Sequence, residues 1–418
     1  MFVRIGNTPR DYAWGSTTAI AALLGRAPSG APEAELWLGA HPGSPSAILD
    51  PSATDGATDL AEWIAREPGR ALGAANAGVG TGEPTRLPYL LKVLAAAVPL
   101  SLQAHPSSEQ ARAGFARENA LGLPLDSPDR NYKDPFHKPE LIYALSETFD
   151  ALSGYREPAV SARVLEALAE RSDDRGRELV GLLAARLRTG AAGDALREST
   201  AWLLGGDPVV RLLVDAVVLA AGRLGGVADG DLGSAVDTVA LLARSFPGDP
   251  GIVLALLLNR ITLERGEVLY LPAGNIHAYL SGLGIELMAA SDNVLRGGLT
   301  GKRVDVPELL SVLDFSPFTV RPLPAQSPLP GLETFRPDVP DFALDVVRLD
   351  DAVPSTGVAL PGAAIALCTE GSVELRGAGH AAALSRGEAV FVTPDEGALA
   401  ISGAGTVFIA TPNVQAPR

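Results

Sequence analysis

A short sequence pattern occurs twice in the chain, and it limits the possible folds more than any other feature. The first copy, Leu263-Glu-Arg-Gly-Glu-Val-Leu-Tyr-Leu-Pro, returns as Leu384-Ser-Arg-Gly-Glu-Ala-Val-Phe-Val-Thr-Pro. Each copy predicts a turn at the glycine, then a short buried strand that ends at a proline. Because one supersecondary unit occurs twice, we expect two related β-domains. Only the first copy continues into a histidine, His277, so the second copy is expected to be structural.

Length and charge limit the classes of protein to which the chain can belong. At 418 residues the chain is too long for one ordinary core, so we expect two or three domains. The net charge of −15 argues against nucleic acid or an anionic membrane as the partner, because both require a basic surface. Apolar stretches such as that from Val209 to Gly222 are interrupted by charges, here Arg211 and Asp215, so we expect no membrane span.

Cysteine content and the first residues indicate the compartment. The single cysteine, Cys368, excludes an intramolecular disulfide framework, and we expect it to be a small buried side chain. The segment from Met1 to Gly6 does not have the charged and then apolar pattern of a signal peptide. Both observations favour a cytoplasmic protein.

The pattern changes between residues 156 and 258, where apolar residues recur at helical spacing. Val160, Val164 and Leu168 follow this spacing, and charged side chains fill the opposite face. Breaks rich in glycine and proline divide the segment into about five amphipathic helices. No motif in this segment carries chemistry, so we expect a helical insertion that packs beside the functional site or covers it.

Four side chains in three short motifs form a candidate metal site. Gln103 and His105 lie in Leu-Gln-Ala-His-Pro, Glu140 lies in His-Lys-Pro-Glu, and His277 lies in Asn-Ile-His-Ala-Tyr. Gln103 and His105 are one residue apart, so on a strand both point to the same face. Two imidazoles, an amide oxygen and a carboxylate suit a borderline divalent metal and can leave a position open for substrate. A single histidine is more often an ordinary residue, so the prediction depends on the combination.

Several motifs carry a resemblance to known proteins. An Arg-Gly-Glu turn, a strand ending in proline and a following histidine are typical of the cupin, a double-stranded β-helix related to the jelly roll. The longer motifs, in chain order, are Asp11-Tyr-Ala-Trp-Gly-Ser, Glu35-Leu-Trp-Leu-Gly-Ala-His-Pro, Leu-Lys92-Val-Leu, Ser101-Leu-Gln-Ala-His-Pro-Ser, Asp134-Pro-Phe-His-Lys-Pro-Glu, Leu271-Pro-Ala-Gly-Asn-Ile-His-Ala-Tyr and Ser291-Asp-Asn-Val-Leu-Arg-Gly-Gly-Leu-Thr. Together they resemble type I mannose-6-phosphate isomerases. The helical segment and the C-terminal part resemble this family in layout more than in sequence.

This resemblance implies a fold, an activity and a set of site residues. The fold would be mainly β, with two cupin-like jelly-roll domains and a helical insertion. The activity would be the zinc-dependent interconversion of D-mannose 6-phosphate and D-fructose 6-phosphate, with one Zn²⁺ per chain. The resemblance places the zinc ligands on Gln103, His105, Glu140 and His277, and an essential arginine on Arg296.

The zones of the sequence give expected domain boundaries. The catalytic cupin domain with the metal site would comprise residues 1–155 and 259–320. The helical insertion would occupy residues 156–258, and residues 321–418 would form a second cupin-like domain without metal ligands. We expect a monomer or a weak dimer.

The reaction requires a proton carrier and a group that stabilises negative charge. Moving a carbonyl between C1 and C2 removes a proton from the neighbouring carbon, passes through an enediolate and returns the proton to the other carbon. Arg296, followed by two glycines that permit close approach, is expected to stabilise the enediolate oxygen. We favour Lys138 and Glu286 as proton carriers because burial and neighbouring charge can tune such groups. His137, Asp292 and a zinc-bound water are the other candidates.

A phosphorylated substrate also needs cations, which an acidic protein must place locally. Lys92, Ser101 and Arg296 are the candidates for the phosphate, because a hydroxyl and two cations can satisfy its oxygens. Whether Arg296 serves the phosphate or the enediolate is open at this point. Only four of the 34 basic residues are lysines, namely Lys92, Lys133, Lys138 and Lys302. All four lie in or beside the site motifs.

Other polar and aromatic residues are expected at the wall of the pocket. Asp292 can orient the arginine or accept a hydrogen bond from a sugar hydroxyl. Trp14 and Tyr279 are candidate walls, although core packing is the commoner role of a tryptophan. His41 lacks a partner ligand in the sequence, so we expect it to be structural.

Two further classes of function fit parts of the sequence. A cupin oxygenase holds a redox-active iron by two histidines and a carboxylate, but Gln103 and the basic residues count against it. A non-enzymatic sugar-phosphate-binding protein would have lost a ligand or the arginine, and none is missing. An isomerase with another sugar preference is a weaker alternative.

Overall fold

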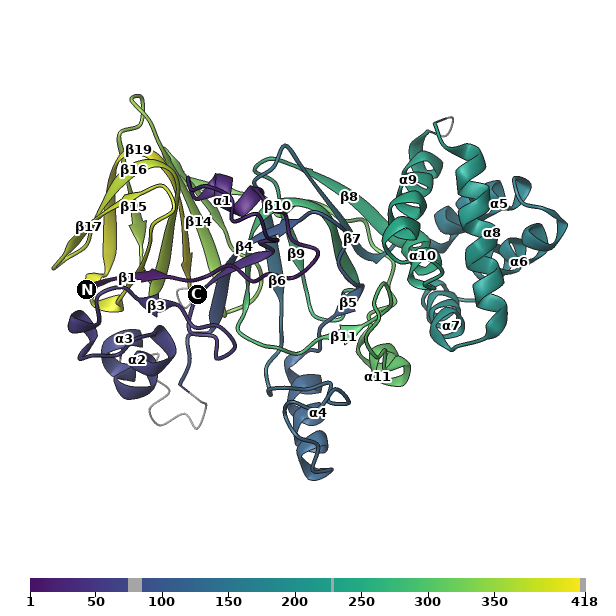
Figure 1. The fold of residues 1–418 in the computed structure, drawn as a ribbon, viewed down its shortest axis with the longest axis horizontal. Coiled ribbons are helices and arrows are strands. Elements are labelled where there is room, and N and C mark those ends of the chain that lie inside the picture. The colour runs from purple at the N-terminus through teal and green to yellow at the C-terminus, as the bar shows by residue number, and fades with distance from the viewer. Residues whose placement is uncertain (74–84, 227–228, 414–418) are drawn as a thin grey trace.

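The computed structural model describes residues 1–73, 85–226 and 229–413 (Figure 1). The molecule is elongated, with one large sheet and both chain ends on one side, a second sheet in the middle and a group of helices on the other side. Helix α4 (Ser108–Ala120) projects from the middle part. Among the described residues, no helix is long and apolar enough to cross a membrane.

The middle sheet contains nine strands in the described part of the chain. They are β2 (Glu35–Leu38), β4 (Tyr89–Ala96), β5 (Gln103–Ala104), β6 (Glu140–Ala144), β7 (Thr148–Tyr155), β8 (Leu258–Glu264), β9 (Val268–Leu271), β10 (His277–Ala289) and β11 (Leu295–Arg296). Strand β10 pairs in antiparallel fashion with β4, β5, β6 and β7, so it connects most of the sheet. The strand that carries Gln103 is only two residues long, and Pro99 and Pro106 on either side of this segment lack the N–H that a ladder needs.

Strand β4 is buried on both faces, and its alternation places one charge inside the middle part of the molecule. Tyr89, Leu91 and Val93 pack into the core shared with the other sheet. Lys92 and Leu94 point to the opposite face. An apolar strand thus delivers one ammonium group to the interior of the middle sheet.

The second sheet contains ten strands within the described ranges. They are β1 (Phe2–Gly6), β3 (Ala47–Ile48), β12 (Gln326–Leu329), β13 (Leu332–Phe335), β14 (Ala343–Leu349), β15 (Ser355–Ala359), β16 (Ala364–Arg376), β17 (Ala381–Ser385), β18 (Ala389–Val392) and β19 (Ala398–Thr411). Strands β1 and β3 belong to this sheet, although the expected boundaries assigned residues 1–155 to the catalytic domain. Strand β1 instead pairs with β18, where it satisfies backbone groups that would otherwise form an open edge.

The repeated sequence pattern forms the same turn in both sheets. It joins β8 to β9 in the middle sheet and β17 to β18 in the second sheet. In both copies the glycine has a positive φ, 95° at Gly266 and 88° at Gly387. The glutamate after it accepts a hydrogen bond of 2.8 Å from the backbone N–H three residues earlier. The prediction of one supersecondary unit in two places is confirmed.

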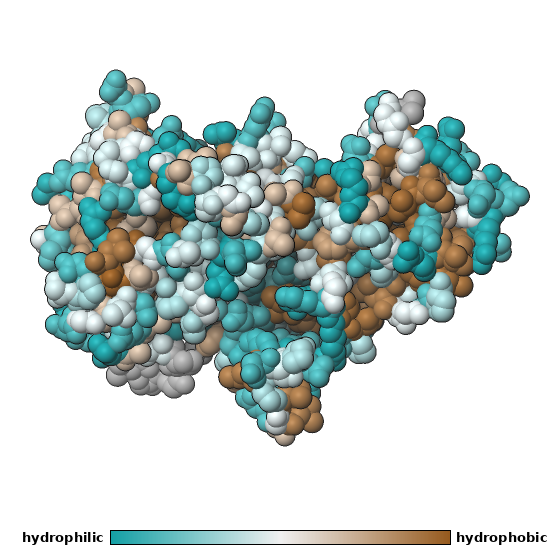
Figure 2. Space-filling model, viewed as in Figure 1, coloured by the Kyte–Doolittle hydropathy of each residue, from teal (hydrophilic) through white to brown (hydrophobic). Residues whose placement is uncertain are grey.

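Helices occupy the segment in which helical periodicity predicted them. They are α5 (Pro158–Glu170), α6 (Asp174–Arg186), α7 (Ala192–Leu204), α8 (Pro208–Leu224), α9 (Gly230–Ser245) and the short α10 (Gly251–Leu254). Their apolar stripes form a core that continues into β10 and the loop after β11. Figure 2 shows apolar atoms on the surface of this helical end, where Leu182, Leu212 and Leu219 are exposed.

Shorter helices lie elsewhere along the chain. They are α1 (Ala19–Leu23), α2 (Leu60–Arg66), α3 (Pro68–Leu72) and α11 (Val306–Val312). Helix α4 begins with a capping box, in which the Ser107 hydroxyl accepts from the Gln110 N–H and the Gln110 amide oxygen accepts from the Ser107 N–H. This cap ends the extended segment that carries Gln103 and His105.

One hydrophobic core joins the two sheets. It contains Leu91 and Ile285 from the middle sheet and Phe391 and Phe408 from the second sheet. The Tyr89 hydroxyl also lies between the sheets, where it is within hydrogen-bond distance of two backbone carbonyls of the second sheet, at 2.9 and 3.0 Å. The two sheets therefore pack against each other and share one continuous hydrophobic core.

Candidate metal centre and substrate pocket

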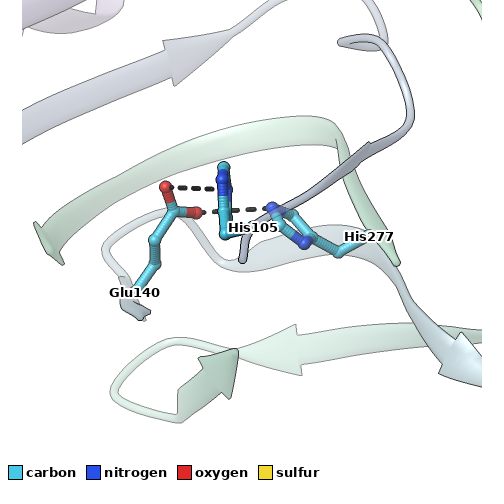
Figure 3. A group of neighbouring side chains, drawn as sticks. All are labelled: His105, Glu140 and His277. Carbon is cyan, nitrogen blue, oxygen red and sulfur yellow. Dashed lines mark ion pairs between the residues drawn. The ribbon is translucent and has the colours of Figure 1, made fainter. Parts of the chain in front are cut away.

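Three predicted ligands meet at one point in the middle sheet (Figure 3). His105 follows β5, Glu140 begins β6 and His277 begins β10. One ligand atom from each lies within 4.8 Å of the others, and all three side chains are buried. The Gly274 N–H donates a 2.8 Å hydrogen bond to the His105 carbonyl, so the turn before His277 is fixed against the second histidine.

Backbone carbonyls fix the orientation of both imidazoles. The His105 Nδ1 lies 2.7 Å from the Asn293 carbonyl, and the His277 Nδ1 lies 3.1 Å from the Asn275 carbonyl. Each Nδ1 therefore carries the proton, and each Nε2 presents a lone pair. Each Nε2 lies 3.3 Å from an oxygen of Glu140. The His105 Nε2 is buried and makes no hydrogen bond among the described residues, which fits a metal ion as its missing partner.

The charge states of His105 and Glu140 also suit a metal. Burial is the main cause that lowers the pKa of His105 to about 4, so its imidazole is neutral at pH 7. Burial alone would raise the pKa of Glu140. Lys138 and His105 outweigh this effect and lower that pKa well below the ordinary value, so the carboxylate is ionised. A neutral imidazole and an ionised carboxylate are donors that suit a divalent cation.

Gln103 and Arg296 lie directly beside the three ligands. In β5, Gln103 is the register partner of His277 on one side and of Arg296 on the other. Residues opposite each other in antiparallel strands place their side chains on the same face. Gln103 therefore lies on the face that His277 and Arg296 share, and Arg296 extends from this face toward the pocket that it lines. Burial lowers the pKa of Arg296, and no group among the described residues pairs with it.

A second group of charges lies behind the three ligands. The Lys92 ammonium is 2.9 Å from Glu286 and 3.3 Å from Glu35, and all three side chains are buried. Lys138 lies closer to the metal centre, with its ammonium 3.0 Å from Glu140. Lys92, Glu286 and the buried Tyr279 line a small cavity of about 50 Å³ next to the predicted ligands.

An open pocket of about 860 Å³ lies in front of the metal centre. Gln103, Lys138 and Arg296 line it. It receives residues from the middle sheet, from the loop after β11 and from the end of helix α9. The other predicted site residues at its wall are Trp14, Lys92, Ser101 and Asp292.

Four predicted residues have different surroundings from those expected. Lys92 faces two carboxylates, which does not favour a role in holding phosphate. Glu286 and Tyr279 line the small cavity and not the open pocket. Asp292 does not pair with Arg296. It contacts His41 instead, with 3.2 Å between Asp292 Oδ1 and His41 Nε2.

Several pocket residues were not found from the sequence. Glu35 belongs to a quoted motif, but its pairing with Lys92 depends on β2 lying next to β4. Arg244, at the end of α9, and Lys302, in the loop after β11, bring two further cations to the pocket. Among the described residues, no carboxylate pairs with Arg244, Lys302 or Arg296. The scarcity of lysine was the one signal that pointed to Lys302.

Comparison with known proteins decides the family. The profile described as phosphomannose isomerase type I, catalytic domain, matches residues 2–158. The chain is 37% identical over 403 residues to the mannose-6-phosphate isomerase of Escherichia coli strain K12, covering 96% of both chains. The chain belongs to the mannose-6-phosphate isomerase family. The human mannose-6-phosphate isomerase is a further relative, 33% identical over 383 residues, with 87% of this chain and 86% of the human protein covered.

Solved structures of the family show the same architecture. A zinc-bound mannose 6-phosphate isomerase is 34% identical, with a TM-score of 0.84 over 99% of this chain and 100% of that chain. The apo form from Salmonella typhimurium is 33% identical, with a TM-score of 0.84 over 99% of both chains. The expected family is confirmed by sequence and by fold.

Proposed function

We propose that this member of the mannose-6-phosphate isomerase family is a zinc-dependent enzyme that interconverts D-mannose 6-phosphate and D-fructose 6-phosphate. The observation that carries the proposal is the buried group of His105, Glu140 and His277, which adjoins a pocket lined by unpaired cations. Such a site suits a small anionic substrate that reacts beside a metal. The family relationship over nearly the whole chain supplies the identity of the sugar.

The metal site is proposed to hold one Zn²⁺ through Gln103, His105, Glu140 and His277. The unpartnered Nε2 of His105 and the fixed tautomers of both histidines support this set. When bound, zinc would supply a Lewis acid that polarises the oxygens at C1 and C2 of the sugar.

Two side chains in the pocket are proposed to handle charge and protons. Arg296 is a permanent cation beside Gln103, and we assign it to the negative charge that develops on the substrate oxygen. Lys138, beside Glu140 and at the pocket wall, is proposed to take the proton from C2 and return it to C1, while the hydroxyl proton moves from the oxygen of C2 to that of C1. Glu286 is proposed to act through Lys92, whose charge it balances inside the small cavity.

The phosphate is proposed to lie at the other end of the pocket. Arg244 and Lys302 line this end, and the backbone N–H of Thr300 is fixed by Asp249 in the segment after α9. Ser101 adds a hydroxyl at the wall. This arrangement places the phosphate between the helical segment and the loop after β11.

The arrangement of the chain suggests a division of labour. We propose that residues 259–320 and most of residues 1–155 form a catalytic cupin-like domain and that residues 156–258 form an inserted domain. Residues 321–418, joined by β1 and β3, would form a second cupin-like domain. We also propose a cytoplasmic protein that acts as a monomer or a weak dimer.

An activity assay with metal removal and replacement tests the proposal. Conversion of mannose 6-phosphate is coupled to a dehydrogenase that follows the downstream hexose phosphate. We expect turnover, its loss after exhaustive chelation and its recovery with one equivalent of Zn²⁺. Lys138→Met should lower kcat by about 10²- to 10³-fold while its zinc content is unchanged.

Other outcomes separate the alternatives. Full turnover in the chelated protein, or none in the zinc form, would contradict the proposal. Binding of mannose 6-phosphate without turnover would indicate a sugar-phosphate-binding protein. Oxygen consumption by an iron-loaded form would indicate an oxygenase.

A further inference from the structure

His41 is a buried histidine outside the metal centre, and its ring is held in one tautomer. Only 6% of its side chain is exposed. The Gly43 N–H donates a 3.1 Å hydrogen bond to His41 Nδ1, so Nδ1 is an acceptor and the proton lies on Nε2. The Trp37 ring packs edge-on against the imidazole, with 5.0 Å between ring centroids. The imidazole therefore presents a single fixed donor.

That donor lies close to Asp292 at the wall of the open pocket. The distance from His41 Nε2 to Asp292 Oδ1 is 3.2 Å, and 54% of the Asp292 side chain is exposed. Burial raises the pKa of Asp292, but the hydrogen bond from His41 and the charges of Lys138 and Lys92 outweigh it and lower the pKa. Among the described residues, Asp292 Oδ2 has no hydrogen-bond partner.

The backbone around Asp292 is fixed as well. The Asp292 N–H donates a 2.8 Å hydrogen bond to Asp134, and the Ser291 hydroxyl donates another of 2.8 Å to the same carboxylate. The carbonyl of the next residue, Asn293, accepts a hydrogen bond from His105 Nδ1. The remaining freedom of Asp292 is in its side chain, and His41 restricts it.

We propose that His41 is a positioning residue that holds Asp292 as a hydrogen-bond acceptor for a sugar hydroxyl of the substrate. The proposal rests on the proposed function, because it assumes a phosphorylated sugar in the pocket. A fixed carboxylate oxygen in a cationic pocket accepts from a hydroxyl but repels a phosphate. Asp292 therefore contacts the sugar, whereas the phosphate is bound by the cations.

Two substitutions of His41 separate positioning from simple packing. In His41→Gln, the side-chain amide nitrogen replaces Nε2 and can still donate to Asp292. In His41→Asn, the amide nitrogen occupies the place of Nδ1 and cannot reach. We expect His41→Asn to raise KM for mannose 6-phosphate by about tenfold, with kcat changed by less than about threefold. His41→Gln should stay within about threefold of the wild type in both constants.

Binding of unreactive probes tests the same idea without turnover. A hexitol phosphate, which has the hydroxyls but no carbonyl, should bind His41→Asn about tenfold more weakly by calorimetry. Inorganic phosphate should bind equally to the variant and the wild type. If the wild type binds the hexitol phosphate but does not convert mannose 6-phosphate, the proposed function fails while the role of His41 is still measured.

A control and a double variant complete the test. His380→Asn removes another histidine that pairs with a carboxylate, Glu396 at 2.6 Å, far from the pocket, and it should leave both constants unchanged. Asp292→Asn should resemble His41→Asn, and the double variant should be no worse than either single variant. Equal effects of His41→Gln and His41→Asn, no effect of His41→Asn, loss of zinc, or equal weakening of inorganic phosphate would overturn the proposal.

Discussion

Lys92 and its two carboxylates show how single residues set the charge of the site. Only 5% of Lys92 is exposed, and burial alone would lower its pKa. Glu286 and Glu35 outweigh burial and raise the pKa of Lys92 above its ordinary value, so the ammonium remains protonated. Burial is the main cause that raises the pKa of Glu286, although Lys92 opposes this rise. The lysine therefore keeps two carboxylates from repelling each other behind the metal centre.

Replacing Lys92 by methionine is expected to destabilise the fold. The methionine fills similar volume but leaves Glu35 and Glu286 as two buried charges without a cation. We expect the free energy of unfolding at pH 7 to fall by about 3–5 kcal/mol, measured by urea denaturation. Adding Glu286→Gln to Lys92→Met should recover part of this loss. An unchanged urea midpoint for the single variant would show that solvent screens the two carboxylates.

At the residue scale, the sequence predicted what spacing and composition can express. Gln103 and His105 were found as a pair because alternation along a strand is local. The link between His41 and Asp292 was missed because the two residues are far apart in sequence, and neither side chain alone indicates a partner. Lys92 was predicted to bind phosphate because the sequence does not show that two carboxylates from other strands, Glu35 and Glu286, lie beside its ammonium.

The repeated turn gives an opportunity to compare the same substitution in two contexts. Gly266→Ala and Gly387→Ala each place a Cβ on a residue with positive φ, which costs about 1–2 kcal/mol. A Cβ at Gly266 would meet nothing closer than the Tyr143 hydroxyl at 3.5 Å, whereas a Cβ at Gly387 would lie 2.6 Å from the Leu24 carbonyl oxygen. We therefore expect Gly387→Ala to lose at least about 1 kcal/mol more than Gly266→Ala, measured by urea denaturation.

A glycine in a helix serves as the control for these two variants. Gly222 lies in α8, and a Cβ there would have open space. Gly222→Ala should stabilise the protein by about 0.5–1 kcal/mol. Equal losses in the two turn variants would show that the clash with Leu24 relaxes at no cost.

Helix α9 is expected to contribute to substrate binding through its last turn. Arg244 lines the pocket from this helix and has no carboxylate partner in the described ranges. Arg244→Ala should raise KM for mannose 6-phosphate by about tenfold, because one charge-assisted hydrogen bond to phosphate is lost, and should leave kcat nearly unchanged. Steady-state kinetics at two salt concentrations would show that KM depends less on salt in the variant than in the wild type.

A matched arginine on another helix controls for general charge effects. Arg177 lies on the exposed face of α6 and pairs with Asp174. Arg177→Ala should leave KM unchanged. A similar rise in KM for both variants would assign the effect to overall charge and not to Arg244.

At the element scale, local periodicity was a reliable guide and long-range pairing was not. The helices between residues 156 and 258 were predicted, because their signals lie within a few residues. The place of β1 in the second sheet was not predicted, because its partner β18 lies at the other end of the chain. The helical segment was expected to pack beside the site or cover it, but which of its helices lines the pocket was not predicted, since a helix shows which face is buried but not what that face adjoins.

At the scale of the whole molecule, the net charge of −15 reflects an excess of carboxylates, and acid protonates these groups. The carboxylate of Glu396 is of particular interest, because its side chain is buried between strands β18 and β19. Burial raises its pKa, but hydrogen bonds from the amino group of Met1, the Gly379 N–H and His380 outweigh burial and lower the pKa to about 2.

A depressed pKa in the folded state makes a definite prediction about pH. The unfolded chain binds a proton at Glu396 near pH 4.5, whereas the folded chain does so only near pH 2. The stabilisation is therefore fully present above about pH 4.5 and is lost as the pH falls toward 2. Because His380 lies at the surface, solvent screens part of the interaction, and we expect a loss of about 1–2 kcal/mol.

Denaturation of two variants over this pH window tests the assignment. Glu396→Gln should be less stable than the wild type at pH 7, and the difference should shrink as the pH falls from 4.5 toward 2, because the wild type alone loses the ionised carboxylate. Glu374→Gln, on an exposed strand of the same sheet, should follow the wild-type curve at every pH. Urea midpoints at pH 7, 5, 4 and 3 would measure both differences. A constant gap between Glu396→Gln and the wild type across these values would mean that the hydrogen bonds to Glu396 stabilise the fold by their geometry and not by the charge of the carboxylate.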